Sequence, residues 1–245
     1  SRKKAISRAI EDLNSGDILL VAGKGHEVYQ EYATKRNKFS DRKIIIKEIK
    51  NKNKKLFSDW KINILKKNCN LTKINKKLLT NGVSINSNNI RKNDIFFGIK
   101  GSNKDGNNYS DEAIKKGAAF CVVSKIKSKN RKKIKVKNTL KVLTDSAKVI
   151  RKISSAKFIS ITGSSGKTSL KELLAFSLNK LSPTAFSKNS FNNKYGVPLS
   201  LMNLKKFHNF GVFEVGMDKA GEINNLTKII QPELAVITNI SYAHI

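Results

Sequence analysis

The stretch Ile159-Ser160-Ile161-Thr162-Gly163-Ser164-Ser165-Gly166-Lys167-Thr168 decides the expected fold, because it reads as a strand, a glycine turn and the start of a helix. Phe158 to Ile161 is a short apolar run typical of a buried strand. The apolar residues that helical spacing then places on one side of a helix are Leu170, Leu173, Leu174, Leu178 and Leu181. Apolar runs alternate with helical patterns through the rest of this region, which predicts an α/β fold with a parallel, doubly wound sheet.

The glycine turn indicates phosphate binding, because backbone N–H groups there can wrap a phosphate at the positive end of the following helix. The expected ATP-binding residues are Gly163, Ser164, Ser165, Gly166, Lys167 and Thr168. Lys167 would reach the outer phosphates, and the Thr168 hydroxyl would hold Mg²⁺. The pattern G-x-x-x-x-G-K-[ST] has a further glycine six residues before the lysine, where this chain has Ile161. The alternative is a plain turn of small residues.

Polar residues also occur where later strands of the predicted sheet end, which is where ligands bind in such sheets. Glu214 is embedded in an apolar strand, and a buried carboxylate needs a partner. That partner is either Mg²⁺, which prefers oxygen ligands, or a nearby lysine. His244 follows another strand end, where a histidine is typically a capping or packing residue. Asn192 and Asn193 precede a turn that enters a helix, and they line either a substrate cleft or a simple loop.

The composition of the chain excludes few functions, although its high positive charge at first suggests a particular kind of partner. The chain has 245 residues and a formal net charge of +31, which would ordinarily indicate nucleic acid or an anionic membrane as partner. Lysine supplies most of this charge and is accompanied by abundant Asn and Ile, the residues that an AT-rich genome encodes most readily. The lysines are spread along the chain and are denser at 50–77 and 125–141, and neither stretch interleaves aromatic residues in the manner of a single-strand binding surface. We therefore expect solvated surfaces and no nucleic-acid partner.

The two cysteines and the apolar segments favour a cytoplasmic protein. Cys121 sits in an apolar run and is expected to be a buried thiol, whereas Cys69 lies in a lysine-rich stretch. Their separation indicates neither a disulfide framework nor a metal site. No apolar run is long enough to span a membrane, and the N-terminus lacks an apolar signal region.

The chain divides into blocks by composition. Residues 1–50 combine a helix, a strand, a glycine-rich loop and a second helix, and are too few to fold alone. Residues 51–77 are rich in lysine and asparagine and read as a linker with some helix around 60–65. Residues 78–156 and 157–245 are the expected second and third domains.

Each block has its own predicted elements. In the first block, Ile6, Ile10 and Leu13 share a helix face, 18–22 is a strand, and Asp41 is the expected N-cap of the second helix. In the second block, the expected strands are 95–99, 118–123 and 140–143, and the expected helices are 110–116 and 145–153. In the third block, helices are expected to end at 181 and to cover 198–204 and 221–230, with strands at 211–215 and 234–237.

A set of motifs in the third block resembles the Mur ligase family, whose members are ATP-dependent enzymes that extend UDP-N-acetylmuramic acid in peptidoglycan synthesis. The motifs are Gly163-Ser164-Ser165-Gly166-Lys167-Thr168, Asn192-Asn193-Lys194-Tyr195-Gly196-Val197-Pro198-Leu199, Phe213-Glu214-Val215-Gly216 and Thr238-Asn239-Ile240-Ser241-Tyr242-Ala243-His244. The Asn-Asn-x-x-Gly-Val-Pro element resembles the members that add D-alanyl-D-alanine. The resemblance implies that Thr168, Glu214 and His244 hold Mg²⁺ and that Asn192 and Asn193 contact substrate.

The second block is similar to the UDP-binding N-terminal domain of the same members. The resemblance rests on Asn93-Asp94-Ile95-Phe96-Phe97-Gly98-Ile99-Lys100-Gly101, Asp105-Gly106 and Lys116-Gly117-Ala118. It implies that Ser87 contacts the substrate. The family usually has Asp-Ser-Arg where this chain has Asn86-Ser87-Asn88, so the usual arginine contact has no counterpart at Asn88.

The first block resembles the C-terminal end of a different Mur ligase, the one that adds the third residue, usually meso-diaminopimelate. The residues concerned are Gly16-Asp17-Ile18-Leu19-Leu20-Val21-Ala22-Gly23-Lys24-Gly25-His26-Glu27 with Tyr29-Gln30. The resemblance implies that Gly23 and Glu27 contact the diamino acid. Taken from the residues alone, the loop would be another phosphate cradle and Glu27 a solvated acid.

The resemblance implies a truncated, P-loop ATPase-like central domain, preceded by a small α/β UDP-binding domain and by the end of a Rossmann-like C-terminal domain. We expect the tail of one ligase joined to the head of the next, with both ends of the chain interior to a longer protein. The implied reaction joins D-alanyl-D-alanine to a UDP-N-acetylmuramoyl peptide through an acyl phosphate, in a protein expected to be monomeric. The chain alone is expected to bind nucleotide weakly, if at all, and not to catalyse ligation. The alternatives are a P-loop NTPase unrelated to the cell wall and a basic, non-catalytic nucleic-acid-binding protein.

Overall fold

The computed structural model describes residues 1–13, 17–23, 27–32, 35–69, 78, 80–126, 128 and 130–241, without the side chains of 30–32, 35–37, 54–60 and 69. The chain forms two compact units, residues 1–56 and 57–245, which are considered separately below. Within the described part of the chain, every helix is too short or too polar to cross a lipid bilayer.

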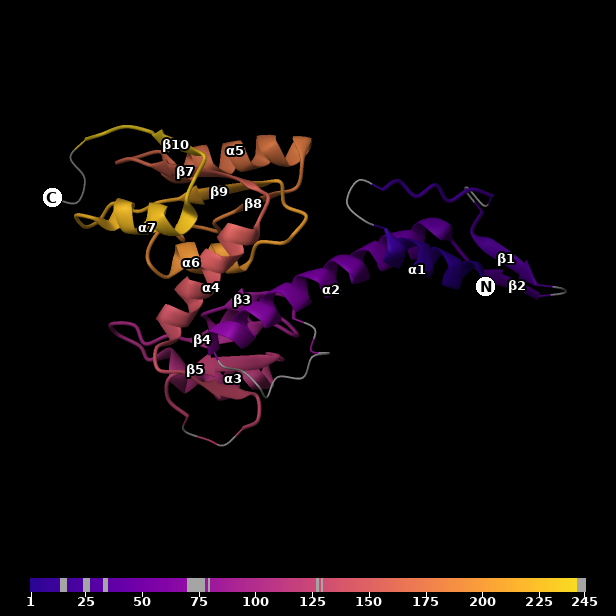
Figure 1. The fold of residues 1–245 in the computed structure, drawn as a ribbon, viewed down its shortest axis with the longest axis horizontal. Helices are drawn as coiled ribbons and strands as arrows, with labels where there is room; N and C mark the ends of the chain where they lie inside the picture. The colour runs from indigo at the N-terminus through magenta and orange to yellow at the C-terminus, as the bar shows by residue number, and fades with distance from the viewer. Residues whose placement is uncertain are drawn as a thin grey trace. The chain divides into compact units, whose positions relative to one another are not determined.

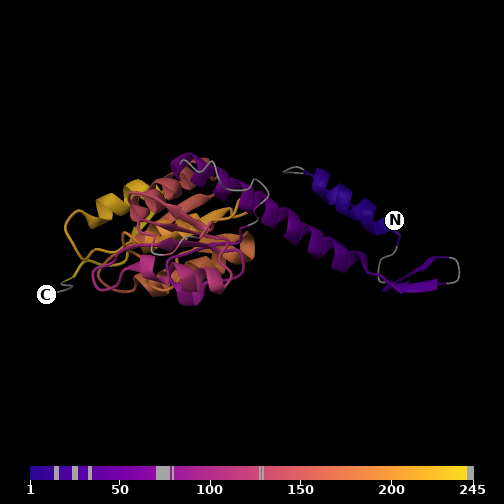
Figure 2. The same ribbon diagram turned by 90° about the horizontal axis from the view of Figure 1, so that it is seen from below.

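The first unit pairs a short helix with the beginning of a long one. Its elements are α1 (Arg2–Asp12), β1 (Tyr29–Tyr32), β2 (Lys35–Lys38) and the start of α2 (Asp41–Cys69). In Figures 1 and 2, α1 runs beside the first turns of α2. Arg2 bonds to Asp41 at one end of this pair, and the Lys52 ammonium donates to the Ile10 and Glu11 carbonyls at the other. A cation at the C-terminus of α1 also complements the helix dipole.

Two predictions for the first unit were wrong. Residues 18–22 form no strand, and the side chains of Ile18 and Leu20 are 94% and 86% exposed. A strand needs a hydrogen-bonded neighbour, and in this unit β1 and β2 pair with each other instead. Asp41 is the first residue of α2, but its carboxylate bonds to Arg2, while the Ser40 hydroxyl accepts a hydrogen bond from the Lys43 N–H. Ser40 therefore caps the helix.

The second unit contains two parallel sheets. The sheet nearer the N-terminus has strand order β3-β4-β5-β6, and the other has order β10-β7-β9-β8. The elements around the first sheet are β3 (Val83–Ser84), η1 (Ser87–Asn89), β4 (Ile95–Gly98), η2 (Gly106–Tyr109), α3 (Ser110–Lys115), β5 (Phe120–Val123) and β6 (Lys133–Lys135). Those that follow are α4 (Thr139–Ile153), β7 (Lys157–Thr162), α5 (Lys167–Leu181), β8 (Thr184–Phe186), α6 (Gly196–Met202), β9 (Phe210–Glu214), α7 (Glu222–Ile230) and β10 (Leu234–Ile237).

The second sheet lies between helices, as Figure 1 shows for α5 on one side and α6 and α7 on the other. Ile161 and Val212 face α5 and pack with Ala175, whereas Phe158 and Phe213 stack on the opposite face with ring centroids 5.6 Å apart. Alternate residues of a strand point to opposite faces, so both faces of this parallel sheet are apolar. The predicted parallel α/β architecture is confirmed.

Helix α4 joins the two sheets. It packs against α6 and α7 on the side of the second sheet and against β4 of the first. Asn203, which follows α6, adds a polar link because its side chain bonds to both the N–H and the carbonyl of Val83 in β3, at 2.9 Å each. One apolar core accordingly runs through both sheets and α4, from Phe97 through Leu143 to Phe213.

The strand predicted at 140–143 was wrong, because these residues form the first turn of α4. The Asn138 side chain accepts a hydrogen bond from the Lys141 N–H and starts the helix. Leu143, Ala147 and Ile150 are then buried at helical spacing. Short strands β3, β6 and β8 and the β1–β2 hairpin were not predicted, because their few residues carry little periodicity.

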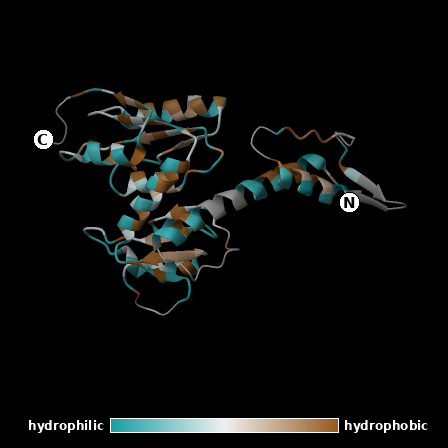
Figure 3. Cartoon of the chain, viewed as in Figure 1, coloured by the Kyte–Doolittle hydropathy of each residue, from teal (hydrophilic) through white to brown (hydrophobic). Residues whose placement is uncertain are grey.

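Three further predictions concern the linker, the apolar side of α5 and Cys121. The linker predicted at 51–77 is helical through Cys69, as part of α2. Leu173 and Leu181 were expected on the buried side of α5 but are 63% and 80% exposed, and Figure 3 shows apolar and polar residues mixed along this helix. Only the part of the apolar stripe that contacts the sheet is covered, namely Leu170, Leu174 and Leu178. Cys121 is buried and free as expected, and burial raises the pKa of its thiol to about 12.

Candidate functional site

The site is built at the carboxyl edge of the second sheet. Parallel pairing aligns Ile161 of β7 with Glu214 of β9 and Val236 of β10 with Ile161, so the segments that follow these strands emerge side by side. The Thr162 hydroxyl donates to the Val215 carbonyl at 3.1 Å and ties the ends of β7 and β9 together. Ligands in open parallel sheets bind at this edge.

The glycine loop after β7 is held by the segment after β10. The carbonyl and the side-chain oxygen of Asn239 accept hydrogen bonds from the N–H groups of Ser164 and Ser165, at 3.0 and 2.9 Å. The Thr238 hydroxyl donates to the Ser165 carbonyl at 2.6 Å, and the Ser164 hydroxyl donates to the Ser241 carbonyl at 2.8 Å. These contacts give the loop one defined shape. Asn239 was not predicted as a loop partner, although its position after a strand of the sheet was a usable signal.

Gly163 and Gly166 have positive φ values of 130° and 78°. A Cβ atom added at Gly163 would lie 2.2 Å from the Thr238 hydroxyl oxygen and 2.9 Å from the Asn239 carbonyl oxygen. A Cβ atom added at Gly166 would meet nothing within 4 Å. Glycine at Gly163 is therefore required by close contact as well as by backbone conformation.

These two glycines make a matched pair for a stability experiment. We expect Gly163→Ala to destabilise the second unit by about 2 kcal/mol more than Gly166→Ala, since both carry backbone strain but only the first adds a clash. The measurement is the urea midpoint of each variant. Equal shifts would mean that the loop relaxes around the added methyl group.

Lys167 and Thr168 begin α5 directly after the loop. The Lys167 ammonium donates to the Gly163 carbonyl at 2.6 Å and lies 3.4 Å from the Ser164 carbonyl oxygen. The first N–H groups of a helix have no intrahelical partner, and the helix dipole adds positive charge at this end. An ammonium group and free helix amides thus converge beside the loop, an arrangement suited to phosphate groups.

Glu214 provides the acid of the site. Its side chain is 1% exposed, its Oε2 accepts a hydrogen bond from the Thr168 hydroxyl at 2.8 Å, and its Oε1 accepts one from the Asn192 side-chain amide at 2.8 Å. Both donors are neutral, and among the described residues no lysine forms an ion pair with this carboxylate. A buried charge without an opposite charge is costly, and a cation would lower that cost.

The loop before α6 carries the two asparagines. Asn192 reaches Glu214, and its carbonyl accepts a hydrogen bond from Gly216 at 2.7 Å. The Asn193 side-chain oxygen accepts hydrogen bonds from the N–H groups of Tyr195 and Gly196, both at 3.1 Å, and so shapes the start of α6. Only Asn192 is joined directly to the acid.

The remaining predicted residues lie elsewhere. Ser87 in η1 donates to Glu112 of α3 at 3.1 Å, so it belongs to the first sheet. The Lys116 ammonium donates to the Asn88 side-chain oxygen at 2.8 Å, which puts a positive charge next to the position where the family has arginine. The Lys116 ammonium also donates to the Glu112 carboxylate, and this second hydrogen bond holds the pKa of the Glu112 carboxyl below its usual value.

In the first unit, Gly23 has a φ of 105°, and the Arg2 guanidinium donates to the neighbouring Ala22 carbonyl at 2.6 Å. The pKa of Arg2 is raised chiefly by its hydrogen bond to Asp41, with smaller contributions from the charges of Asp41 and Glu27. His244 and residues 24–26 lie outside the described residues, so the predicted roles of His244 and of the loop between Gly23 and Glu27 stay predictions.

A glycine loop between a parallel strand and a helix, with an acid at the end of the neighbouring strand, defines a protein of the phosphate-loop class. Residues 80–164 match a family model described as the catalytic domain of the Mur ligase family, and residues 161–245 match the Mur ligase middle domain. The chain belongs to the Mur ligase family.

Named relatives agree with this membership. The chain is 40% identical over 174 residues to the UDP-N-acetylmuramoyl-tripeptide–D-alanyl-D-alanine ligase of Rickettsia prowazekii (strain Madrid E), over 70% of this chain and 38% of that protein. A crystal structure of MurF from Acinetobacter baumannii matches with a TM-score of 0.65 and 30% identity, over 74% of this chain and 41% of that one. The MurF ligase of Thermotoga maritima in complex with ADP matches with a TM-score of 0.57 and 32% identity, over 67% and 39%. The chain spans about two fifths of the length of these proteins.

Proposed function

We propose that residues 78–245 form the UDP-binding and ATP-binding part of a ligase that joins D-alanyl-D-alanine to UDP-N-acetylmuramoyl-tripeptide in peptidoglycan precursor synthesis. The observation that carries this proposal is the network of Thr168, Glu214 and Asn192 beside the glycine loop. Its support from relatives is the ligase activity named for the Rickettsia prowazekii protein.

In this proposal the phosphates of ATP bind at the start of α5. The N–H groups of Ser164 and Ser165 are engaged by Asn239, so the phosphate contacts come from the amides of Gly166, Lys167 and Thr168. The Lys167 ammonium leaves the Gly163 carbonyl and neutralises charge on the transferred phosphoryl group. Phosphoryl transfer of this kind depends mainly on positioning and charge neutralisation.

Mg²⁺ fits the same place by the chemistry of its donors. A hydroxyl from Thr168 and a buried carboxylate from Glu214 are hard oxygen ligands, and within the described part of the chain the carboxylate is paired only with neutral donors. We propose that these two side chains hold Mg²⁺ with His244 as a further ligand. The ion would supply neutralisation of the phosphate charges.

The substrate side of the proposal concerns four polar residues. Ser87, on the first sheet, contacts the UDP-linked substrate, and Lys116 supplies positive charge near Asn88 in place of the family's arginine. Asn192 and Asn193 border the region where the tripeptide carboxylate must meet the γ-phosphate. That carboxylate takes the γ-phosphoryl group of ATP, with release of ADP, and becomes an acyl phosphate. The D-alanyl-D-alanine amine then attacks the acyl carbon, which forms the amide bond and releases phosphate.

Phosphate release tests the proposal. It is measured with ATP, Mg²⁺ and UDP-N-acetylmuramoyl-tripeptide, with and without D-alanyl-D-alanine, for this chain and for any longer polypeptide that contains it. Release that requires both substrates in a longer polypeptide is the expected result. Phosphate release that depends on neither substrate would instead indicate a phosphate-loop NTPase unrelated to the cell wall.

The chain itself is expected not to complete the reaction. It spans about two fifths of the proteins that it resembles, so we propose that ligation requires further elements of those proteins. Ligation measured with the isolated 245-residue chain would contradict this.

For residues 1–50 we propose the end of a C-terminal domain from a diaminopimelate-adding ligase, with Gly23 and Glu27 as contacts to the diamino acid. The supporting features are the positive φ of Gly23 and the hydrogen bond from Arg2 to the carbonyl of the neighbouring Ala22. Calorimetric titration with meso-diaminopimelate should give heat that Glu27→Gln abolishes. Equal heat from both proteins would sink the assignment.

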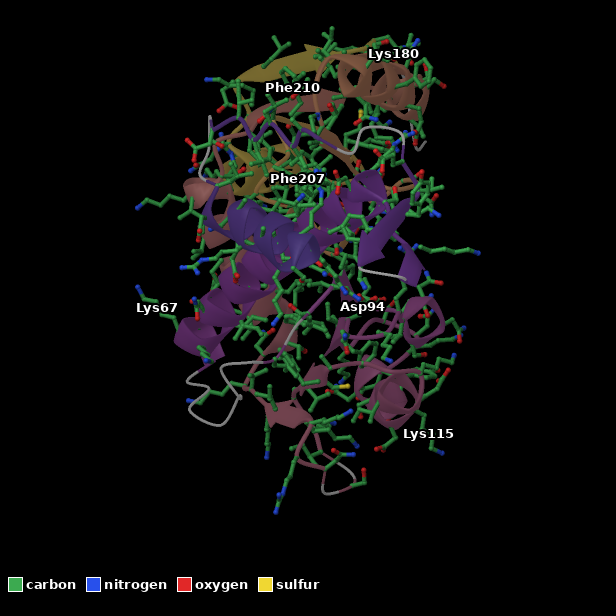
Figure 4. All side chains as sticks on the ribbon, turned by 90° about the vertical axis from the view of Figure 1, so that its right-hand side faces the viewer. Lys67, Asp94, Lys115, Lys180, Phe207 and Phe210 are labelled. Carbon is green, nitrogen blue, oxygen red and sulfur yellow. The ribbon has the colours of Figure 1, made fainter. Side chains whose placement is uncertain are left out.

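We further propose a cytoplasmic monomer with no nucleic-acid partner. Lysines such as Lys67, Lys115 and Lys180 are exposed, and Figure 4 shows Lys67 and Lys115 extending outward, as expected for solvated surface charge. Sedimentation at increasing concentration tests the monomer. Binding to duplex DNA that persists at physiological salt would indicate a nucleic-acid partner and contradict this proposal.

A further inference from the structure

Lys171 is a buried lysine in the middle of α5. Its side chain is 0% exposed, its ammonium donates to the Asn189 carbonyl at 2.6 Å, and it lies 3.1 Å from the Glu172 carboxylate. Lysine is almost never fully buried unless it is paired, because desolvating its charge is costly. Its burial here is therefore compensated both by the Glu172 carboxylate on α5 and by the loop segment that accepts its hydrogen bond.

That segment is residues 187–193, the loop between β8 and α6, and it surrounds Glu214. The Ser187 hydroxyl accepts a hydrogen bond from the Glu214 N–H at 3.1 Å, and the Asn192 side chain donates to the Glu214 carboxylate at 2.8 Å. Asn189 has a φ of 48°, a conformation that costs a non-glycine residue about 1 kcal/mol or more. The Lys171 ammonium binds the carbonyl of this same strained residue.

The contacts close a ring. Thr168 and Lys171 are three residues apart on α5, so they lie on the same side of the helix. Thr168 donates to one oxygen of the Glu214 carboxylate, and Asn192 donates to the other. The Lys171 ammonium links the loop back to α5 through its hydrogen bond to the Asn189 carbonyl. The loop is thus fastened to the helix that begins at the phosphate loop.

We infer that Lys171 is a positioning residue that fastens the 187–193 loop to α5, so that Asn192 keeps the Glu214 carboxylate turned toward Thr168. The anchoring itself is a property of the free protein. Its consequence for Mg²⁺ rests on the proposed function.

Two adjacent amides report on the anchoring. The Gly216 N–H donates to the Asn192 carbonyl at 2.7 Å, whereas the Val215 N–H donates to Ile161 of β7 at 2.9 Å. Amide hydrogen exchange follows local opening, so the first amide senses the loop and the second senses the sheet. The variant is Lys171→Met in the 245-residue chain, and the control is Lys180→Met, at an exposed lysine of the same helix.

In Lys171→Met we expect Gly216 to exchange at least about tenfold faster while Val215 stays within about twofold, and Lys180→Met to alter neither. Equal acceleration of both amides would mean that Lys171 only stabilises the unit as a whole, and it would overturn the inference. Unchanged exchange at Gly216 would overturn it as well, because the loop would then hold without Lys171.

A measurement on the unmodified chain covers the case in which Lys171→Met does not fold. The Lys171 ammonium should give a slowly exchanging ¹⁵N resonance, because it is buried and hydrogen-bonded to Asn189. The exposed lysines should give none. A Lys171 ammonium that exchanges as fast as theirs would overturn the inference.

A further experiment, with nucleotide, distinguishes failure of the inference about Lys171 from failure of the proposed function. The gain in ATP affinity on adding Mg²⁺ should fall at least about fivefold in Lys171→Met, with little change in affinity without Mg²⁺. If Gly216 is deprotected but this gain is unchanged, the anchoring role stands and the assignment of Mg²⁺ to Glu214 fails.

Discussion

Replacement of Lys167 by alanine should lower the affinity for ATP at least about a hundredfold and bring ATP turnover by any active longer polypeptide to background. A hydrogen bond to a charged group is worth about 1.5–3 kcal/mol, and about 2.8 kcal/mol corresponds to a hundredfold change in affinity. Lys167 stands at the start of α5 with its ammonium over the glycine loop, so its removal takes away a full charge where phosphates would bind.

Binding is measured by titration with a fluorescent ATP analogue and turnover by phosphate release, both in a longer polypeptide that contains this chain, because the chain alone is expected to bind nucleotide weakly. Lys180→Ala is the matched control, because it removes one positive charge from the exposed far end of the same helix. Circular dichroism checks that Lys167→Ala keeps its fold despite losing the contact with the Gly163 carbonyl. An affinity within a few-fold of the unmodified chain would remove Lys167 from the phosphate site and with it the nucleotide assignment.

The glycine loop could be predicted because its signals are local. The apolar strand, the small residues of the loop and the helical spacing after Lys167 are contiguous in the sequence, and the structure has β7, loop and α5 in that order. Glu214 was also open to prediction, since an acid inside an apolar strand conflicts with burial unless it has a partner. The identity of that partner was not, because Thr168 and Asn192 are 46 and 22 residues away in the chain.

The predictions that failed concern features that depend on contacts between residues distant in sequence, or segments too short to carry a clear sequence pattern. Residues 18–22 have the composition of a strand, but the strands described in their unit, β1 and β2, pair with each other. Residues 140–143 are apolar enough for a strand, yet the cap at Asn138 and the spacing of Leu143, Ala147 and Ile150 make them helical. Lys171 reads as one of many lysines, and only the path of the loop across α5 shows that it is buried.

Glu214→Gln should weaken ATP binding in the presence of Mg²⁺ but not in its absence. Without the ion, removal of a buried negative charge beside the phosphates should leave affinity unchanged or raise it, because like charges repel. With Mg²⁺, the variant loses an anionic ligand, so the gain in affinity from the ion should fall at least about tenfold. Glutamine keeps the size of the side chain and can still accept the hydrogen bond from Thr168.

The measurement is the affinity for the ATP analogue in excess EDTA and then in excess Mg²⁺. Glu222→Gln is the control, since it removes a negative charge from the first turn of α7, outside the network that joins Thr168 to Asn192. A loss of affinity confined to the Mg²⁺ condition distinguishes loss of an ion ligand from general disruption of the fold, which would weaken binding under both conditions. A Mg²⁺ gain of the same size in Glu214→Gln would mean that the carboxylate only orders Thr168 and Asn192, and that the ion is held by other residues.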